Sequence, residues 1–345
     1  MSELFTGVDF MLAYLSRRLL LAGFTTIVIS MLAFFVMEVP PGDAATKFVD
    51  LLMSAGDTSS MEHAETIRKD LGLDKPVFQR YLWWVSNLVQ GKWGMSFQYF
   101  CSSHPLEKPV REIISDRIFT TVVLTGFTIL FTWTFAIPIG IYSAVRQHTV
   151  GDYVFTTLGF TGLAVPDFLL GLVLMYLAFA YFDQTVGGLF SGDFVNAPWS
   201  FAKFIDMVNH LWIPAIVLGT SGTAGLIRIM RNNLLDELSK PYVLTAQAKG
   251  VAPFKLILKY PVRVAINPLV STVGYLLPQL VSGSVIVSVV LSLPTLGPVL
   301  LDAIINLDTM TAGFIVLLLG MLTILGTLIS DILLAVIDPR IKLSG

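Results

Sequence analysis

The sequence predicts an all-α polytopic membrane protein with six transmembrane helices, a small external domain after the first helix, and a helical cytoplasmic loop between the fourth and fifth. Of the 345 residues, 54% are hydrophobic and only 13% charged, with a mean hydropathy of +0.75. These values exceed what the core of a soluble protein needs. Apolar stretches of about 20 residues, the length that crosses the hydrocarbon core, also recur along the chain. The composition indicates a protein embedded in membrane lipid and argues against nucleic acid as a partner.

Each span is placed where charged residues are absent. The third contains one acid, Asp167, beside Pro166, where we expect a kink or a local hydrogen bond. The fifth falls in a charge-free region that leaves room for a re-entrant segment. The predicted spans are Leu19–Met37, Ile118–Val145, Val154–Phe182, Leu211–Ile227, one helix between Arg263 and Asp302, and Thr309–Ser330 extended to about Ile337.

The distribution of Lys and Arg orients the chain, because cytoplasmic connections retain basic residues. Residues 183–210 hold a single base, Lys203, and residues 293–310 hold none. The bases on the other side are Arg17, Arg18, Arg146, Arg228, Arg231, Lys240, Lys249, Lys255, Lys259, Arg263, Arg340 and Lys342. We therefore expect a multi-pass membrane protein with both termini in the cytoplasm.

Three regions follow from this topology: a cytoplasmic N-terminus with the first helix (1–38), an extracytoplasmic domain (39–117) and a membrane core (118–345) with helices two to six and the loop 228–263. The first helix reads as a signal anchor that is retained, because no small-residue cleavage site follows it. Within the external domain, Pro76–Gly91 predicts a helix rich in aromatic residues. It suits either the headgroup boundary or the packing of that domain.

The search for catalytic and metal sites gives no candidate. The chain has one cysteine, Cys101, so an internal disulfide is impossible, and Cys101 with His104 supplies only two ligands. The sequence has no GxxxxGK[ST] phosphate loop, and no span carries the pair of acids or histidines expected of a hydrolase or proton relay. We expect no catalytic residue, no metal and no cofactor in this chain, and no hydrolysis of ATP by this chain alone.

The most informative segment is the basic loop 228–263. Its run YVLTAQAKG predicts a short helix over Tyr242–Lys249, after which Gly250 adopts the left-handed conformation that ends a helix. Pro253 suits the first position of a second helix. Ala246 and Ala248 are small, which would let another protein approach closely. At helical spacing Tyr242, Ala246 and Lys249 would share one face.

The second helix carries a basic stripe. From Pro253 onward, Lys255, Lys259 and Arg263 recur every four residues, with Leu256 and Ile257 on another side. We expect this helix to lie along the membrane surface and to lead into the fifth span. The charges alone fit any cytoplasmic loop.

The loop resembles a known family. YVLTAQAKG, followed by Ile266, Asn267 and Pro268, is similar to the coupling-loop motif in permease subunits of ATP-binding-cassette importers of the dipeptide, oligopeptide and nickel class. Other matching stretches span nearly the whole chain: YLSRRLL (14–20), PPGDAA (40–45), LGLDKPVFQRY (71–81), GKWGMSF (91–97), IPIGIYSAVR (137–146), LPTLGPVLLDAI (293–304) and IDPRIKL (337–343).

The resemblance implies a binding-protein-dependent transporter in a prokaryotic cytoplasmic (inner) membrane. Its expected partners are a second, homologous permease subunit, two ATPase subunits that hold ATP and Mg, and an extracytoplasmic solute-binding protein. It assigns the ATPase contact to Tyr242, Thr245, Ala246, Gln247, Ala248, Lys249 and Gly250. The chain departs from the family at Gln247, a position that is commonly basic, and before Pro294, where the usual aromatic residue is missing.

Two groups of polar residues are candidates for the translocation path and its gate. Gln279, Ser282, Ser284 and Ser288 form a polar strip that either lines the path or packs against neighbouring helices. Asp302 and Asp308 lie outside the membrane and could contact the binding protein or the gate. For Asp308 simple solvation is the favoured interpretation.

The leading function is an importer permease for peptides or similar small solutes. The same machinery could instead import oligosaccharides or metal chelates. A secondary transporter would show inverted repeats and an ion-coupling acid within the membrane, and a membrane enzyme would show a catalytic cluster at one face. We find neither pattern in the sequence.

Overall fold

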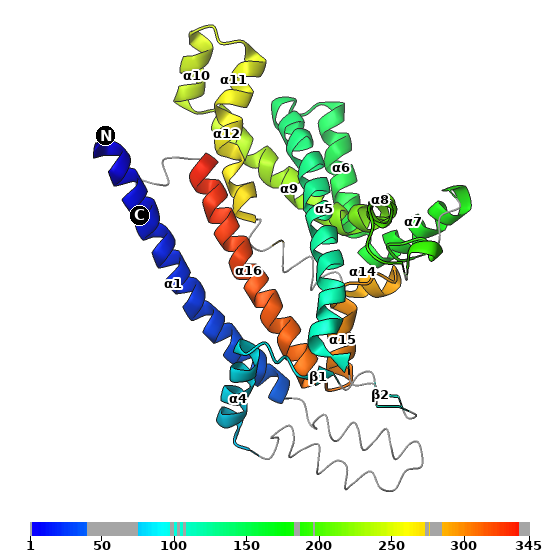
Figure 1. Ribbon diagram of the computed structural model, residues 1–345. Coiled ribbons are helices and arrows are strands. Elements are labelled where there is room, and N and C mark those ends of the chain that lie inside the picture. The colour runs from blue at the N-terminus through cyan, green and yellow to red at the C-terminus, as the bar shows by residue number, and fades with distance from the viewer. Residues whose placement is uncertain are drawn as a thin grey trace. The chain divides into compact units, whose positions relative to one another are not determined.

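The computed structural model describes residues 2–39, 75–96, 100–101, 104–105, 108–182, 187–195, 197–272, 276 and 285–337, and these are mainly helical. Two short antiparallel β-ladders pair β1 (Met95–Ser96) with β4 (Lys108–Pro109) and β2 (Phe100–Cys101) with β3 (His104–Pro105). The long helices are α1 (Ser2–Glu38), α5 (Val110–Val145), α9 (Trp212–Leu238) and α16 (Thr309–Ile337) (Figure 1). The shorter ones are α4 (Val77–Val89), α6 (Val150–Ala164), α7 (Asp167–Phe182), a 3₁₀ turn η1 (Gly192–Phe194), α8 (Phe201–His210), α10 (Pro241–Ala248), α11 (Pro253–Lys259), α12 (Pro261–Ala265), α14 (Val285–Val290) and α15 (Leu296–Ile305).

Four helices in the described part of the chain are long and apolar enough to cross a membrane, or five if a bent pair counts as one span. The four are α1, α5, α9 and α16, and they confirm the predicted first, second, fourth and sixth apolar helices. Helix α5 begins at Val110, earlier than the predicted Ile118 and inside the region assigned to the external domain. Residues 40–74 of that domain lie outside the described residues.

The third predicted span is not one straight helix. It is the bent pair α6 and α7, whose axes differ by 103°, and Figure 1 shows α7 leaving the end of α6 sideways. Val165, at φ −83° and ψ 126°, is extended because the ring of Pro166 disfavours helical geometry in the residue before it. The predicted kink is therefore a full break, with Asp167 as the first residue of α7.

The fifth predicted span lies largely outside the described residues. Residues 273–275 and 277–284 are not described, whereas α12 precedes them and α14 follows them. The structure therefore describes only the flanks of this span.

The chain divides into two compact units, one formed by residues 1–18, 122–294 and 323–345, the other by residues 19–121 and 295–322. The first unit has two apolar cores along α9. One core gathers near the start of α9 and the other near its end. The first comprises Leu124, Leu189, Met207, Leu211, Val217, Leu218, Val287, Leu291 and Leu293, and the second Ala136, Ala144, Leu226, Ile227, Met230, Leu234, Val262, Ala265 and Leu269.

In the second unit, α4 packs on the end of α1. The rings of Tyr81 and Trp84 lie 5.6 and 5.8 Å from that of Phe34, and Arg80 pairs with Glu38 at 2.7 Å. The predicted helix at this position is confirmed. Tyr81 and Trp84 serve packing, whereas Trp83 remains exposed.

Candidate functional site

The loop after α9 turns at a proline. Lys240 is extended, at φ −73° and ψ 145°, and Pro241 follows it as the first residue of α10. Proline suits this position because its fixed φ is helical and the N–H it lacks would have no partner in the first turn. The end of α9 and the start of α10 are thus separated by only Ser239 and Lys240.

The end of α10 has the geometry of a Schellman motif. Gly250 has φ +74°, its N–H donates to the carbonyl of Gln247 at 2.9 Å, and the N–H of Val251 donates to that of Ala246 at 3.3 Å. This paired pattern satisfies carbonyl groups at the end of a helix and requires a left-handed residue. The predicted role of Gly250 in ending the helix is confirmed, as is the start of the next helix at Pro253.

The prediction of one continuous basic helix from Pro253 onward is wrong. The chain forms α11 and then α12, with Tyr260 at φ −111° and ψ −76° between them. Pro261 is the reason, because it has no N–H to continue the helix and its ring clashes with the preceding turn. Lys255, Lys259 and Arg263 are all exposed, but they lie on two helices.

α10 and α11 share a small core of their own, built from Val243, Ala246 and Leu256. The partly buried Val251, Ile257 and Tyr260 pack around it. Ala246 is only 8% exposed, so it faces α11 and not the outside. The expected shared face of Tyr242, Ala246 and Lys249 is therefore corrected: the first and last are exposed, and Ala246 is buried between the two helices.

The outward surface of α10, which we call the α10 face, consists of Tyr242, Leu244, Thr245, Gln247, Ala248 and Lys249. Leu244 is 58% exposed and was not among the predicted contact residues. Its position was readable from the sequence, since Val243 and Ala246 are the core pair at helical spacing and Leu244 lies off their face. An exposed leucine beside uncharged side chains suits a contact with protein.

The α10–α11 hairpin is attached to α9 through α12. Val262, Ala265 and Leu269 belong to the same buried cluster as Met230 and Leu234 of α9. The hydroxyl of Tyr242 also donates to Glu237, in the last turn of α9. The hairpin is therefore joined to α9 both by apolar packing through α12 and by a side-chain hydrogen bond.

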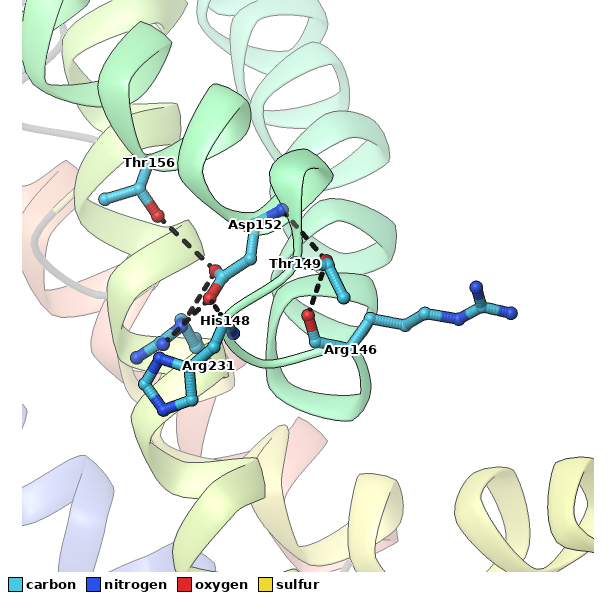
Figure 2. Close-up of polar contacts among 6 residues, drawn as sticks. All are labelled: Arg146, His148, Thr149, Asp152, Thr156 and Arg231. Carbon is cyan, nitrogen blue, oxygen red and sulfur yellow. Dashed lines mark hydrogen bonds and ion pairs between the residues drawn. The ribbon is translucent and has the colours of Figure 1, made fainter.

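A partly buried ion pair joins α9 to α6. The Nε and Nη2 atoms of Arg231 lie 3.2 and 3.1 Å from the two carboxylate oxygens of Asp152 (Figure 2). Asp152 is 3% exposed. Two parallel charge-assisted bonds define both the distance and the orientation of the partners. We call this pair the α6–α9 strut.

The turn before α6 holds Asp152 in place. Thr149 accepts a bond from the N–H of Asp152 at 3.4 Å, the N–H of His148 donates to the carboxylate at 3.1 Å, and Thr156 donates at 3.5 Å. Figure 2 shows Arg146 contributing its carbonyl to Thr149 while its side chain points away. This site was not predicted from the sequence. The capping pattern Thr149-x-x-Asp152 before an apolar run would have indicated it.

Three of the four predicted path residues lie outside the residues that the structure describes. Gln279, Ser282 and Ser284 fall on residues that are not described, and Ser288 is fully buried in α14. In this conformation the side chain of Ser288 faces protein.

The two predicted gate residues differ in environment. Asp302 is exposed on α15. Asp308 is fully buried, where it accepts bonds from the N–H and hydroxyl of Thr311, at 3.1 and 2.7 Å, and from the hydroxyl of Ser96. The interpretation of Asp308 as a solvated acid is therefore wrong, because it caps the first turn of α16.

Within the described residues, no group of three or more His, Cys, Asp or Glu side chains could hold a metal ion. Cys101 and His104 are paired residues of the β2–β3 ladder. Their spacing is thus accounted for by strand pairing.

The chain matches two family models. The model described as "binding-protein-dependent transport system inner membrane component" matches residues 136–343, and the model for the N-terminal part of such components matches residues 11–125. The oligopeptide transport system permease protein AppB of Bacillus subtilis is 33% identical over 332 residues, covering 96% of this chain and all of the relative. The dipeptide transport system permease protein DppB of Escherichia coli K12 is 31% identical, covering 96% of this chain and 99% of the relative.

The fold also has a solved counterpart. A chain of the MetNI methionine ABC transporter in an inward-facing conformation superimposes with a TM-score of 0.50 at 16% identity, covering 67% of this chain and 99% of that chain. Proteins of the matched family are the permease parts of importers and are not enzymes by themselves. The chain belongs to the family of inner membrane components of binding-protein-dependent transport systems.

Proposed function

We propose that this permease subunit imports peptides or similar small solutes, driven by ATP hydrolysis in separate subunits. Its partners would be a second homologous permease, two ATPase subunits that bind ATP and Mg, and an extracytoplasmic binding protein. The relatives named for oligopeptide and dipeptide transport cover nearly the full chain, which supports peptides as the solute class.

The α10 face carries the proposal for coupling. The hairpin has its own core, a Schellman end and two proline-led helices, so it can act as a rigid body. Its outward residues would fit a cleft of the ATPase, with Leu244 at the centre and Tyr242, Thr245, Gln247, Ala248 and Lys249 around it. Ala246 and Gly250 would act by shaping the hairpin.

The α6–α9 strut and the α12–α9 packing would carry the movement further. When the ATPase subunits close on ATP, the hairpin would pull on α9 through α12. The bidentate pair would oblige α6 to follow α9. This is the rigid-body kind of switch expected for alternating access.

The proposed topology has six spans and both termini in the cytoplasm. The basic residues of the α10–α12 region support its placement at the cytoplasmic face, since positive charge is retained there. Asp302 is proposed to lie on the side of the membrane that receives the binding protein. The path residues near α14 are proposed to lie on the same side. Gln279, Ser282, Ser284 and Ser288 are proposed as path residues.

Reconstituted vesicles test this function. The complete transporter with a labelled peptide and the binding protein should accumulate peptide only when ATP is enclosed with the ATPase subunits. Vesicles that hold both permeases but no ATPase subunit are the matched control, and we expect them to show no uphill uptake. Accumulation against a gradient in that control would refute the proposal. A panel containing an oligosaccharide and a metal chelate would identify the solute class.

A further inference from the structure

Helix α8 has its charged residues on the inside and its apolar residues on the outside. Phe201, Phe204, Ile205 and Val208 follow the spacing i, i+3, i+4, i+7 of one helix face and are 79%, 40%, 45% and 36% exposed. The ionisable residues Lys203, Asp206 and His210 lie on the opposite face of the same helix. A helix at a water-covered surface has the reverse arrangement.

The charged side chains on the inward face of α8 have hydrogen-bond partners within the same chain. Lys203 is 6% exposed, and its Nζ donates to the carbonyls of Val195 and Ala197 at 3.3 and 2.6 Å. The same ammonium group lies 4.8 Å from the centre of the Phe190 ring. A lysine near water ordinarily extends its ammonium group into it. Here the side chain is turned towards the preceding loop instead.

Asp206 binds that loop a second time. Its carboxylate accepts from the N–H and the hydroxyl of Ser191, both at 2.8 Å, and His210 bonds to the carbonyl of Asp206 at 2.7 Å. Every ionisable side chain of α8 thus has a partner in its own chain. This satisfaction of polar groups is what a hydrocarbon environment demands.

The position of α8 indicates the depth of its apolar stripe. The helix ends at His210 and α9 begins at Trp212, with the buried Leu211 as the shared residue between them. Helix α9 is long and apolar enough to cross a membrane. With α9 as a span, α8 would lie at the membrane boundary, at the end of α9 opposite to the α10–α11 hairpin. The exposed Trp199 precedes α8, and Trp and Tyr are enriched at such boundaries.

From these observations we propose that α8 is a membrane-interface helix, with Phe201, Phe204, Ile205 and Val208 immersed among the acyl chains of the adjacent leaflet. The size of the stripe favours lipid over protein as the occupant. Four partly exposed side chains present about 400 Å², given 150–250 Å² for a whole aromatic residue. A stable protein interface needs about 800 Å² from each partner.

Site-directed spin labelling of the assembled transporter tests this proposal. A Cys101→Ser background removes the single native cysteine, and one cysteine is then introduced at 204, 205 or 208 and labelled. Matched controls at Ala202 and Asn209 lie on the flank of the same helix and are also exposed. The complex is placed in vesicles of phosphatidylethanolamine and phosphatidylglycerol, and collision with oxygen and with a nickel chelate is measured.

We expect oxygen to dominate at 204, 205 and 208 and the nickel chelate to dominate at 202 and 209, so that the ratio varies with the helical period. In addition, Ile205→Glu should shift a label at 208 towards the nickel chelate, whereas Asn209→Glu should not. Nickel access at all five positions would mean that the stripe faces water. Low access of both reagents at 205 and 208, with or without the binding protein, would mean that protein covers it. Either result would overturn the proposal.

Discussion

Helix α9 is flanked by two short helical segments of opposite construction. At its start, α8 turns Lys203 and Asp206 inward and leaves an apolar stripe outside. At its end, the α10–α11 hairpin turns Val243 and Leu256 inward and leaves its lysines outside. Exposure therefore follows the environment and not the residue type: α8 has the pattern expected of a helix in lipid, and the hairpin has the pattern expected of helices in water.

The α6–α9 strut offers the largest effect, because it stiffens the helix that joins the two segments. Replacing Arg231 by Leu leaves the Asp152 carboxylate buried without its guanidinium. We expect a loss of about 2–4 kcal/mol in the free energy of unfolding, less than for a fully buried pair because the guanidinium is partly exposed, measured by denaturation in mixed micelles. Arg228→Leu removes an exposed arginine of the same helix and should cost under about 0.5 kcal/mol. Equal losses for the two variants would show that the strut contributes no specific stability.

A pair of lysine substitutions addresses the contrast directly. Lys203→Met removes the charged donor to two carbonyls, and we expect a loss of about 1.5–3 kcal/mol, the range for hydrogen bonds to charged groups. Lys255→Met, at an exposed site of α11, should change the unfolding free energy by less than about 0.5 kcal/mol. If Lys203→Met were as mild as its control, the inside-out description of α8 would be incorrect.

Substitutions at two glycines distinguish the effect of backbone strain from that of steric crowding. A Cβ at either Gly250 or Gly225 would meet nothing within 4 Å, but only Gly250 has a positive φ. Gly250→Ala should therefore destabilise by about 1–2 kcal/mol and reduce ATP-driven uptake, with normal membrane insertion. Gly225→Ala, in the helix α9, should be neutral or stabilise by about 0.4–1 kcal/mol. Unchanged melting and uptake for Gly250→Ala would contradict the Schellman end.

The smallest effect on stability, but a clear one on coupling, is expected at the α10 face. Leu244→Ser should change the unfolding free energy by less than about 0.5 kcal/mol, because the side chain is exposed. It should nevertheless lower peptide uptake per ATP hydrolysed in the reconstituted transporter. Leu258→Ser, at an exposed leucine of α11, is the control and should leave that ratio unchanged. The reverse ranking would move the contact surface from α10 to α11.

Local chemistry predicted much of this architecture. The left-handed Gly250 and the start at Pro253 depend on neighbours in sequence and were predicted correctly, and each end of α10 was predicted to within one residue. The prolines Pro166 and Pro261 themselves indicate the breaks at those positions. The full breaks were not predicted, because the long apolar and basic periodicities around them favoured continuous helices.

Long-range contacts could not be predicted in the same way. Asp152 and Arg231 are 79 residues apart, and no local pattern pairs them. The inward face of Ala246 depends on α11 folding back over α10. Asp308 was misassigned as solvated because its burial involves Ser96, which is far away in sequence, although an acid before a helix start is a recognisable cap.

Cysteine crosslinking in the assembled transporter determines whether the exposed face of α10 contacts an ATPase subunit. In a Cys101→Ser background, single cysteines at Leu244 and Gln247 should crosslink to an ATPase subunit, and crosslinking should change when ATP is added. Cysteines at Val243 and Ala246, one residue away on the same helix but buried against α11, should not crosslink. Crosslinks from the buried pair, or none from the exposed pair in an active transporter, would contradict the assignment of the α10 face as the site of coupling.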